Sequence, residues 1–421
     1  ITTINSKVFC GCESIKELEI PSGVTSIGDN AFDDCIGLTS LNIPGSVTSI
    51  GSNAFDGCIG LVSINVPGGL TSIGENAFFG CEKLKSIVLQ DHLEVIGSGA
   101  FKRCSRLKSL TLPENIPSFG QQVFNGCLSI PEVTVPTNLT SVHKKMFNGC
   151  EKLRFIAIPE TVVSLCQSAF CGCKRLEEIS IPSSVISIGD CAFRDCERLK
   201  TIAIPDSTTE IGERVFSGCK KLSGVVLSNS LTVIGEKLFF GCDALSSVVI
   251  PGNVTSICKC AFYGCRGLGE IVLPNTTKSI DDYAFYGCEG LTSISIPESV
   301  TTIGRRAFSE CIKLKTINIP NGVTTIGKRS FSGCRRLTSM AISSSVASIG
   351  NSSFYGCTQL EKIEVDVDNQ HYQTSRGVLF NKGETQLIWC SNSMRGSYSI
   401  PGSVTSIKKH AFEKCEVESV I

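Results

Sequence analysis

The sequence predicts an α+β repeat solenoid, in which short coils of equal length stack along one axis. Cysteines recur every 23 residues from Cys12 to Cys357, and Cys415 resumes the spacing after one longer unit. A phenylalanine stands three residues before each of these seventeen cysteines, and apolar residues recur three, six and eight residues after them. A fixed period of this size indicates units that bury their apolar faces only by stacking on their neighbours.

The seventeen repeating cysteines are called the ladder cysteines below. They are Cys12, Cys35, Cys58, Cys81, Cys104, Cys127, Cys150, Cys173, Cys196, Cys219, Cys242, Cys265, Cys288, Cys311, Cys334, Cys357 and Cys415.

The first part of each unit is predicted to be a short strand. In residues 38–44, Leu41 and Ile43 alternate with Ser40 and Asn42, so the apolar pair faces inward and the polar pair outward. Pro44 ends this strand because it has no N–H to donate to the next coil. Parallel strands of this kind are expected along one face of the solenoid.

The rest of the unit returns the chain to the next strand. Residues 47–51, Val-Thr-Ser-Ile-Gly, are expected to form a second short extended segment on the opposite side. Residues 53–58, Asn-Ala-Phe-Asp-Gly-Cys, are expected to form a tight helical or 3₁₀ turn.

The recurring pattern L-x-x-I-x-I-P-x-x-V-T-S-I-G-x-x-A-F-x-x-C resembles the BspA-type (Treponema-pallidum-type) leucine-rich repeat over nearly the whole chain. One position departs from the general leucine-rich pattern. The Asn or Cys expected eight residues after the first Leu is a small residue such as Ser46 or Gly69, and the cysteines precede the strand instead. This difference is typical of the BspA-type subclass. The resemblance implies a right-handed leucine-rich-repeat array.

Three regions are expected along the chain. Residues 1–365 are regular 23-residue repeats, residues 366–400 form a variant repeat, and residues 401–421 form a final partial repeat. In the variant repeat, the runs GVLF and TQLIW around Asn-Lys-Gly-Glu predict a β-hairpin insertion. The chain starts and stops within a repeat, which suggests an array truncated at both ends or ends covered by partner copies.

Composition excludes several classes of partner. Lys plus Arg equals Asp plus Glu at 39 each, so bulk charge does not draw the chain to nucleic acid or to an anionic membrane. No run of eighteen apolar residues occurs, so no membrane insertion is expected within this segment, and no signal peptide is visible in it.

The cysteines have two interpretations. The favoured one makes the ladder cysteines small buried packing groups beside the phenylalanines. The alternative is disulfide pairing between adjacent coils, where the spacing suits a bridge but neighbouring Cβ vectors point the same way. Seven cysteines lie outside the ladder, and of these Cys166 and Cys191 are the suggested disulfide pair.

No metal, cofactor or catalytic site is expected. The pairs Cys10-Gly-Cys12, Cys171-Gly-Cys173 and Cys258-Lys-Cys260 lack the spacing and the partners of a zinc site. No residue breaks the repeat to supply a nucleophile beside a base or paired carboxylates in a cleft. The glycines recur as turn residues without a phosphate-binding context. We therefore expect a protein that is not an enzyme.

Recognition is expected at the outward positions of the strands. The columns five and seven residues after each ladder cysteine are mostly small and weakly polar. The centre of the chain differs, because there an aromatic residue lies among charges of both signs, a combination typical of interface hot spots. The candidate binding residues are Glu132, Arg154, Phe155, Glu177, Glu178 and Lys200.

Two further surface features bear on function. A column of threonines, including Thr25, Thr48 and Thr71, is reminiscent of ice-binding solenoids, but residues such as Glu94 and Pro117 interrupt it. Sequons for N-glycosylation occur at Asn138, Asn253, Asn275 and Asn351. The sequons modestly favour a secreted protein.

These observations favour a non-catalytic scaffold that is surface-displayed or secreted and that binds proteins or glycan and matrix ligands through its exposed strand face. The resemblance implies the same role, since BspA-type arrays occur in bacterial surface antigens and in protist surface proteins involved in adhesion. The alternative is a structural subunit that self-associates end to end or laterally into a filament or coat. An extracellular or cell-surface location is expected in the first case.

Overall fold

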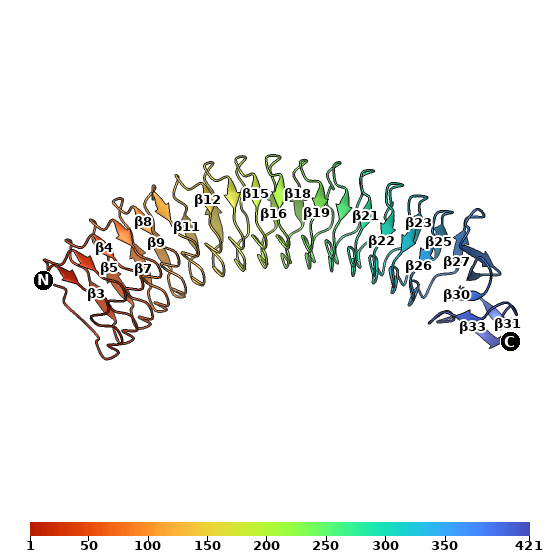
Figure 1. Ribbon diagram of the computed structural model, residues 1–421, viewed down its shortest axis with the longest axis horizontal. Coiled ribbons are helices and arrows are strands. Elements are labelled where there is room, and N and C mark those ends of the chain that lie inside the picture. Colours follow the sequence, from red (N-terminus) through yellow and green to blue (C-terminus); the bar gives the residue numbers. More distant parts are fainter. The chain divides into compact units, whose positions relative to one another are not determined.

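The computed structural model describes residues 1–421 and contains no helix. The chain divides into two units, Ile1–Cys219 and Lys220–Ile421. Within each unit, successive coils lie side by side and carry two series of short strands (Figure 1). The predicted repeat solenoid is therefore confirmed, whereas its α component is wrong.

The second extended segment of the repeat forms the longer sheets. We call these strands, each ending eight residues before a ladder cysteine, the second strand series. In Ile1–Cys219 they form two parallel sheets, of order β1-β2-β4-β6-β8-β10 and β12-β14-β15-β17. In Lys220–Ile421 they form one, of order β19-β20-β21-β22-β24-β26.

The bounds of the second strand series are β1 Thr3–Ile4, β2 Ser26–Ile27, β4 Ser49–Ile50, β6 Ser72–Ile73, β8 Val95–Ile96, β10 Ser118–Phe119, β12 Ser141–Val142, β14 Ser164–Leu165, β15 Ser187–Ile188, β17 Glu210–Ile211, β19 Val233–Ile234, β20 Ser256–Ile257, β21 Ser279–Ile280, β22 Thr302–Ile303, β24 Thr325–Ile326, β26 Ser348–Ile349 and β32 Ser406–Ile407.

The predicted Leu-x-x-Leu-x-Ile strands form the first strand series, which begins five residues after a ladder cysteine. Its parallel pairings include β3-β5, β7-β9, β11-β13 and β23-β25-β27. Its strands are β3 Ser40–Asn42, β5 Ser63–Asn65, β7 Ser86–Val88, β9 Ser109–Thr111, β11 Glu132–Thr134, β13 Phe155–Ala157, β16 Thr201–Ala203, β18 Gly224–Val226, β23 Thr316–Ile319, β25 Ser339–Ile342 and β27 Lys362–Val365.

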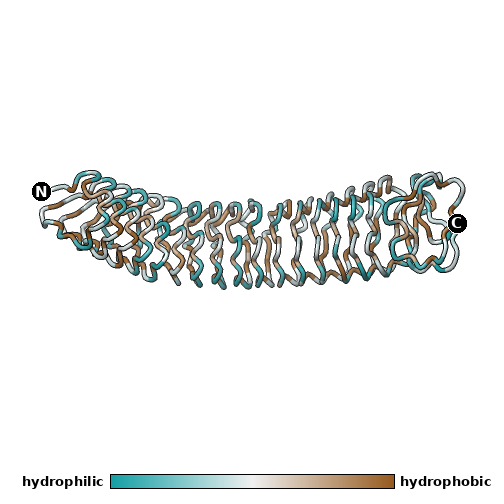
Figure 2. The backbone as a smooth tube through the Cα atoms, turned by 90° about the horizontal axis from the view of Figure 1, so that it is seen from below, coloured by the Kyte–Doolittle hydropathy of each residue, from teal (hydrophilic) through white to brown (hydrophobic).

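The alternation of the first series is as predicted. In β3, Leu41 is buried while Ser40 and Asn42 are exposed, and hydrophobic stretches recur at the same place in successive coils (Figure 2). After the strand, the Val47 N–H donates to the Pro44 carbonyl across 3.1 Å, which closes the turn that the proline begins.

The phenylalanine column forms the centre of the core. The rings of Phe32 and Phe55 stack with centroids 5.1 Å apart and planes 4° from parallel, and the next rings continue the stack in the same way. Most of these rings are fully buried, but Phe9 and Phe412 are only partly buried. Each buried ring therefore packs against the coils before and after its own.

The predicted helical turn before each ladder cysteine is wrong. Asn53 and Gly57 adopt left-handed φ angles of 52° and 66°, which a right-handed helix excludes. The N–H groups of Asn53, Phe55 and Gly57 donate to carbonyls of the next coil, at Glu75, Ala77 and Phe79, over 2.8–2.9 Å. These donors bind between coils and not along the segment, so the segment is a series of tight turns.

A glycine follows most second-series strands and marks a close approach of two coils, although His143, Cys166, Cys258 and Asp281 are among the residues that replace it. A Cβ on Gly51 would lie 2.6 Å from the Asp29 nitrogen and 2.7 Å from the Gly28 carbonyl carbon. Backbone atoms cannot move away as a side chain can. Glycine therefore allows adjacent coils to come into contact here.

Fifteen of the seventeen ladder cysteines are buried as predicted, whereas Cys12 and Cys415 are only partly buried, and most of the ladder thiols also form a hydrogen bond that packing alone does not explain. The Cys58 thiol donates to the Phe32 carbonyl oxygen of the preceding coil across 3.1 Å. The same oxygen accepts the Cys35 N–H at 3.1 Å. Equivalent thiol bonds join Cys35, Cys81, Cys104, Cys127, Cys150, Cys173, Cys196, Cys219, Cys265, Cys288, Cys311, Cys334 and Cys357 to the phenylalanine carbonyl of the preceding coil.

The variant repeat lies in Lys220–Ile421. Its GVLF and TQLIW runs lie in β29 Val378–Asn381 and β30 Gln386–Cys390, which pair antiparallel, and β28 Tyr372–Ser375 pairs with β29. The last strands are β31 Arg395–Tyr398 and β33 Glu416–Val420, which pair in parallel. The fully buried side chain of Asn369 fixes the start of this region, donating to the carbonyls of Ser343 and Val346 and accepting the N–H of Tyr372.

Candidate functional site

The candidate binding residues lie on neighbouring coils of Ile1–Cys219. Arg154, Glu177 and Lys200 each stand four residues after a ladder cysteine, and Glu132, Phe155 and Glu178 stand five residues after one. Backbone hydrogen bonds join Arg154, Glu177 and Lys200 across their three coils. The Glu177 N–H donates to the Arg154 carbonyl, and the Lys200 N–H donates to the Glu177 carbonyl. The repeat therefore brings residues 23 positions apart into adjacent places, and we call these six residues the central patch.

Phe155 is the exposed aromatic residue of the central patch. Phe155 is the first residue of β13, and 48% of its surface is exposed although its side chain is large and apolar. The Arg154 guanidinium lies 5.3 Å from the centre of its ring. This cation–π contact holds the ring and the charge together on the surface.

Glu177 forms ion pairs with basic residues on both neighbouring coils. Its carboxylate lies 3.2 Å from the Lys200 ammonium and 3.8 Å from the Arg154 guanidinium. The Lys200 hydrogen bond, reinforced by the positive charges around it, holds the pKa of Glu177 below its usual value. Exposed ion pairs add little to stability, so this alternation of charge bears on recognition more than on folding.

Two further carboxylates lie in the Phe155 column. Glu132 is directly opposite Phe155 in the pairing of β11 with β13, and it is exposed. Glu178 is exposed at the same column position of the next coil. The aromatic ring therefore has acidic groups in its column on both neighbouring coils.

Arg198 is a member of this network that the sequence analysis missed. Its guanidinium lies 3.8 Å from the Glu177 carboxylate. Arg198 stands two residues before Lys200 in the chain, and both contact Glu177. Strand alternation could not predict this contact, because Arg198 lies in the turn before β16.

The sequence analysis also missed an exposed apolar row in Lys220–Ile421. Val226, Val249 and Val272 stand seven residues after consecutive ladder cysteines and are 64%, 83% and 77% exposed. The fixed column position predicts their outward direction, but the face was described only as weakly polar. This valine row departs from that description.

A partly exposed aromatic stack lies on the turns of the same unit. The rings of Phe240, Tyr263 and Tyr286 follow one another at centroid distances of 4.6 Å. Tyr283 lies beside them, and the guanidinium of Arg305 is 5.7 Å from its ring. Stacking covers the faces of the rings, so this row presents mainly ring edges.

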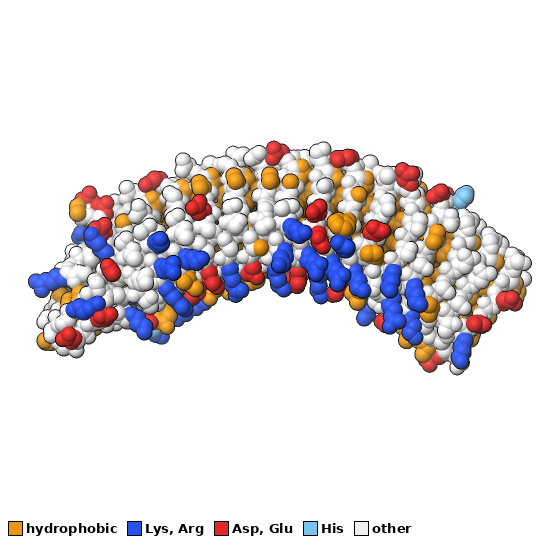
Figure 3. All heavy atoms as spheres, turned by 180° about the vertical axis from the view of Figure 1, so that it is seen from behind, with side chains coloured by type: hydrophobic (Ala, Val, Ile, Leu, Met, Phe, Trp, Pro, Cys, Tyr) orange, Lys and Arg blue, Asp and Glu red, His pale blue; other side chains and the backbone are white.

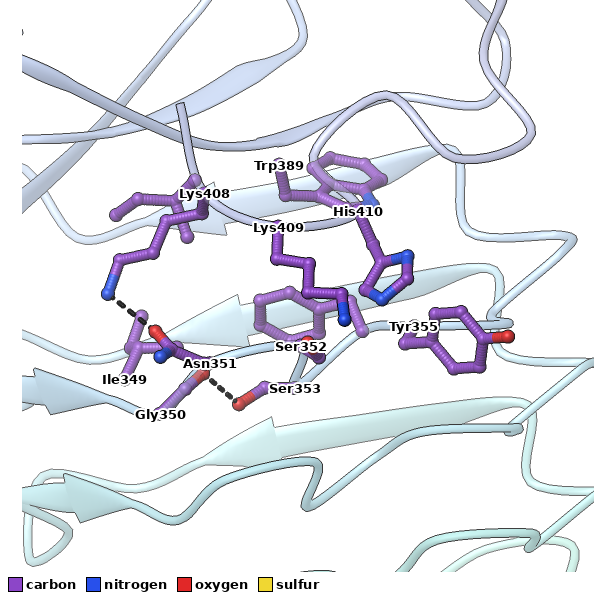
Figure 4. Close-up of a pocket in the computed structure, with 12 residues that line it drawn as sticks. Ile349, Gly350, Asn351, Ser352, Ser353, Tyr355, Trp389, Lys408, Lys409 and His410 are labelled. Atoms are coloured by element: carbon purple, nitrogen blue, oxygen red, sulfur yellow. Dashed lines mark hydrogen bonds between the residues drawn. The ribbon is translucent and has the colours of Figure 1, made fainter. Parts of the chain in front are cut away.

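Two hollows of the surface lie away from the central patch. The crevice in Figure 4 has a volume of about 10 Å³, which suits one water molecule at most. Trp389, Tyr355 and His410 line it, and the Lys408 ammonium donates to Asn351 across 2.8 Å. A wider depression of about 500 Å³ lies over β14, β15 and β17, on the other strand series from the central patch.

The cysteines outside the ladder are not paired as suggested. Cys166 and Cys191 are both free thiols and partly buried, so that predicted disulfide is wrong. The Cys166 thiol instead lies 3.7 Å from the Ser164 hydroxyl of its own segment. The ladder thiols Cys35 and Cys150 are also free, and burial raises the pKa of Cys35 to about 11 and of Cys150 to about 12.

The threonine column uses its hydroxyl donors within the protein. The hydroxyls of Thr25, Thr48 and Thr71 each donate to the carbonyl oxygen of the equivalent residue in the preceding coil, over 3.0–3.3 Å. These bonds connect neighbouring coils. They give the column a structural explanation that needs no ice-binding function.

The four sequon asparagines differ in their surroundings. Asn138 exchanges two hydrogen bonds with the backbone of Ile116, at 3.0 and 3.1 Å, whereas Asn275 is exposed in the turn after a strand. Asn253 donates to the Asn229 carbonyl, and Asn351 accepts the Lys408 ammonium. Asn275 therefore remains the most accessible candidate for glycosylation.

The surface charges are mixed in sign. On the face that Figure 3 presents, Lys and Arg side chains gather with Asp and Glu along one edge of the coils, and neutral side chains cover most of the rest. This distribution agrees with the equal totals of 39 basic and 39 acidic residues. The structure contains no helix with the length and apolar character needed to cross a bilayer.

Comparison with solved structures finds proteins that resemble this chain. A leucine-rich repeat protein from Bacteroides ovatus is 32% identical, covers 87% of this chain and 83% of its own, and superposes with a TM-score of 0.57. A leucine rich cell surface protein from Faecalibacterium prausnitzii is 26% identical and covers 86% of this chain and 89% of its own, with a TM-score of 0.47. No curated protein matches the chain.

The family comparison covers nearly the whole chain. The model of the BspA type leucine rich repeat region matches residues 2–127, 71–180, 140–269, 255–376 and 388–421 in overlapping segments. These segments include both strand series and the turns that carry the ladder cysteines. The chain belongs to the BspA-type leucine-rich repeat family.

Proposed function

We propose that the chain is a non-catalytic scaffold that binds a protein partner through the central patch. The observation that carries this proposal is the exposed Phe155 ring held against Arg154 and bordered by the Glu177 ion pairs. Aromatic and arginine side chains dominate the binding energy of protein interfaces. Few other strand-face positions of Ile1–Cys219 combine an aromatic ring with both signs of charge.

The neighbouring coils suit a broad contact. Outward positions such as Ser63, Ser86 and Ser109 are small and exposed, so a partner can approach the strand face without displacing long side chains. Short strands joined by hydrogen bonds between coils keep this face in place. A preorganised surface loses little conformational entropy on binding.

The proposal includes an extracellular or cell-surface location and an adhesive role toward protein, glycan or matrix ligands. Family membership supports both. The absence of catalysis is proposed because the most strongly raised pKa values belong to buried ladder thiols, whose S–H groups bind backbone carbonyls. Thiols in that state are poor nucleophiles.

The test is affinity capture from extracts of candidate surface proteins, with the purified chain as bait. The double variant Arg154→Ala/Phe155→Ala should lose the captured partner, while Ser63→Ala/Ser86→Ala, which alters exposed positions of the same strand series, should retain it. Val249→Ser is the third bait, because loss of capture by this variant alone would assign binding to the valine row. Light scattering of each bait distinguishes a free scaffold from the alternative self-assembling subunit, which would appear as ordered polymers.

A further inference from the structure

Cys390 occupies an unusual place in the variant repeat. Its N–H donates to the Ala411 carbonyl across 2.8 Å, just as the Phe32 N–H donates to the Ala54 carbonyl across 2.8 Å in a regular repeat. By this backbone criterion Cys390 stands where a regular coil has its stacked phenylalanine. A small thiol thus replaces a large ring at this position.

Trp389, the residue before Cys390, packs an aromatic ring against the phenylalanine column. The Trp389 indole packs edge-on against Phe354, with centroids 6.4 Å apart and planes at 69°. Phe412, in the final repeat, packs at an angle against Tyr398 and not against another ring of its column. Position 390 therefore adds no aromatic ring to the interior between the variant repeat and the final repeat.

The ladder cysteine of the final repeat meets Cys390 in this space. The sulfur atoms of Cys390 and Cys415 lie 2.8 Å apart, and the Cys415 thiol also donates to the Ser391 carbonyl across 3.1 Å. Regular ladder thiols such as Cys58 and Cys334 point instead to a phenylalanine carbonyl. A second sulfur as a close neighbour distinguishes Cys415 from these ladder cysteines.

We propose that Cys390 and Cys415 form a disulfide that joins the hairpin of the variant repeat to the final repeat. Two observations carry it, namely the contact of the two sulfur atoms and the backbone position of Cys390 in the phenylalanine column. A bond between sulfurs needs a separation of about 2.05 Å, so a small movement of the side chains suffices. The linked residues already belong to one apolar cluster with Val378, Phe380 and Leu387.

The oxidant is a low-molecular-weight disulfide such as oxidised glutathione. Cys415 is partly exposed and Cys390 is buried, so the Cys415 thiolate attacks first and forms a mixed disulfide, releasing one glutathione thiol. The Cys390 thiolate then attacks the Cys415 sulfur and releases the second glutathione. The protein gives up two protons and two electrons, and one glutathione disulfide becomes two thiols.

The bond has a structural consequence. It would close a loop that runs from β30 through β31 and β32 to the final turn, and a closed loop restricts the unfolded chain. The final repeat, whose Phe412 and Cys415 are only partly buried, would gain the most. We expect slower backbone hydrogen exchange in residues 395–415 of the oxidised protein than of the reduced protein.

The experiment incubates the whole chain with excess oxidised glutathione, stops the exchange with acid, and alkylates the denatured protein before digestion with trypsin. The expected product is one linked species that joins residues 383–395 to residues 415–421. The buried thiols should be recovered alkylated, and exposed thiols such as Cys10 either alkylated or bound to glutathione, so no second linked pair of protein cysteines is expected. The neighbouring ladder thiols Cys334 and Cys357 serve as the internal control and should be recovered as separate alkylated residues.

Two variants complete the test. Cys415→Ser should abolish the linked species and leave Cys390 alkylated, and Cys390→Ser should leave Cys415 alkylated or glutathionylated. The proposal is overturned if the wild-type chain yields Cys390 and Cys415 only in alkylated form, or if Cys415 remains bound to glutathione while Cys390 is alkylated. Linkage of Cys415 to any cysteine other than Cys390 would overturn it equally.

Discussion

The Cys58 thiol donates a hydrogen bond to the Phe32 carbonyl oxygen of the preceding coil across 3.1 Å. That oxygen also accepts the Cys35 N–H, so one carbonyl serves two donors from two coils. The phenylalanine and cysteine columns are therefore linked through the backbone as well as by packing. The same thiol bond recurs in most regular coils, as at Cys81, Cys196 and Cys334.

Replacing Cys58 by alanine should lower stability. The variant loses the thiol donor and leaves a small cavity, and we expect the free energy of unfolding to fall by about 1–2 kcal/mol. Chemical denaturation followed by circular dichroism measures it. Cys10→Ala, at an exposed position, should change the midpoint little, and equal effects of the two substitutions would contradict the role assigned to the ladder thiol.

The ladder thiols should resist alkylation in the folded protein. Burial raises the pKa of Cys150 to about 12, so at pH 8 its reactive thiolate is scarce as well as covered. Iodoacetamide applied to native protein, followed by peptide mass spectrometry, should label the exposed Cys10 and leave Cys150 unlabelled. Labelling of both residues at similar rates would show that the coils open readily.

Alanine at Gly51 should be more disruptive than alanine at Gly45. A Cβ at residue 51 would approach backbone atoms of the preceding coil to 2.6 Å, whereas a Cβ at residue 45 meets nothing within 4 Å. We expect Gly51→Ala to cost about 1–3 kcal/mol and Gly45→Ala to remain within about 0.5 kcal/mol of wild type. Urea midpoints of the two variants compare the positions, and similar midpoints would refute the close approach.

Asp56 should make stability depend on pH. Burial and the nearby charges of Asp33 and Asp34 raise its pKa to about 6 in the folded state, above the usual 3.8. The folded state therefore holds the proton more tightly, so this contribution is complete below about pH 4 and is lost as the pH rises through 6. Asp56→Asn should be about 1 kcal/mol more stable than wild type at pH 7, after allowance for solvent screening, and nearly equal to it at pH 4.

Urea midpoints at pH 4 and pH 7 measure this difference. Glu17→Gln removes a carboxylate at an exposed position and is the matched control, expected to show no such change between the two pH values. If Asp56→Asn were equally stable relative to wild type at both pH values, the raised pKa of Asp56 would be wrong.

The repeat architecture could be read from the sequence because the period itself places residues. Phe32, Phe55 and their equivalents are identical in every regular unit, and identical residues at equal spacing have one physical solution, a stacked column. The same logic placed Arg154, Glu177 and Lys200 next to one another before their contacts were known.

The turns could not be predicted in the same way. A short segment such as Asn-Ala-Phe-Asp-Gly-Cys fits either a helical turn or a pair of left-handed residues, and local propensity favours neither strongly. The choice is made by hydrogen bonds from Asn53, Phe55 and Gly57 to the next coil, which are tertiary contacts. The contact of Cys390 with Cys415 was hidden for a related reason, since the variant repeat breaks the 23-residue spacing.

The central claim is that Arg154 and Phe155 form the recognition surface. The most direct test is to measure capture of surface proteins by wild type, by Arg154→Ala/Phe155→Ala and by the Ser63→Ala/Ser86→Ala control at equal bait concentration. We predict that capture by the first variant falls tenfold or more, with an unchanged melting temperature, because hot-spot residues of this type contribute about 2 kcal/mol or more. Undiminished capture by the folded Arg154→Ala/Phe155→Ala variant would contradict the claim.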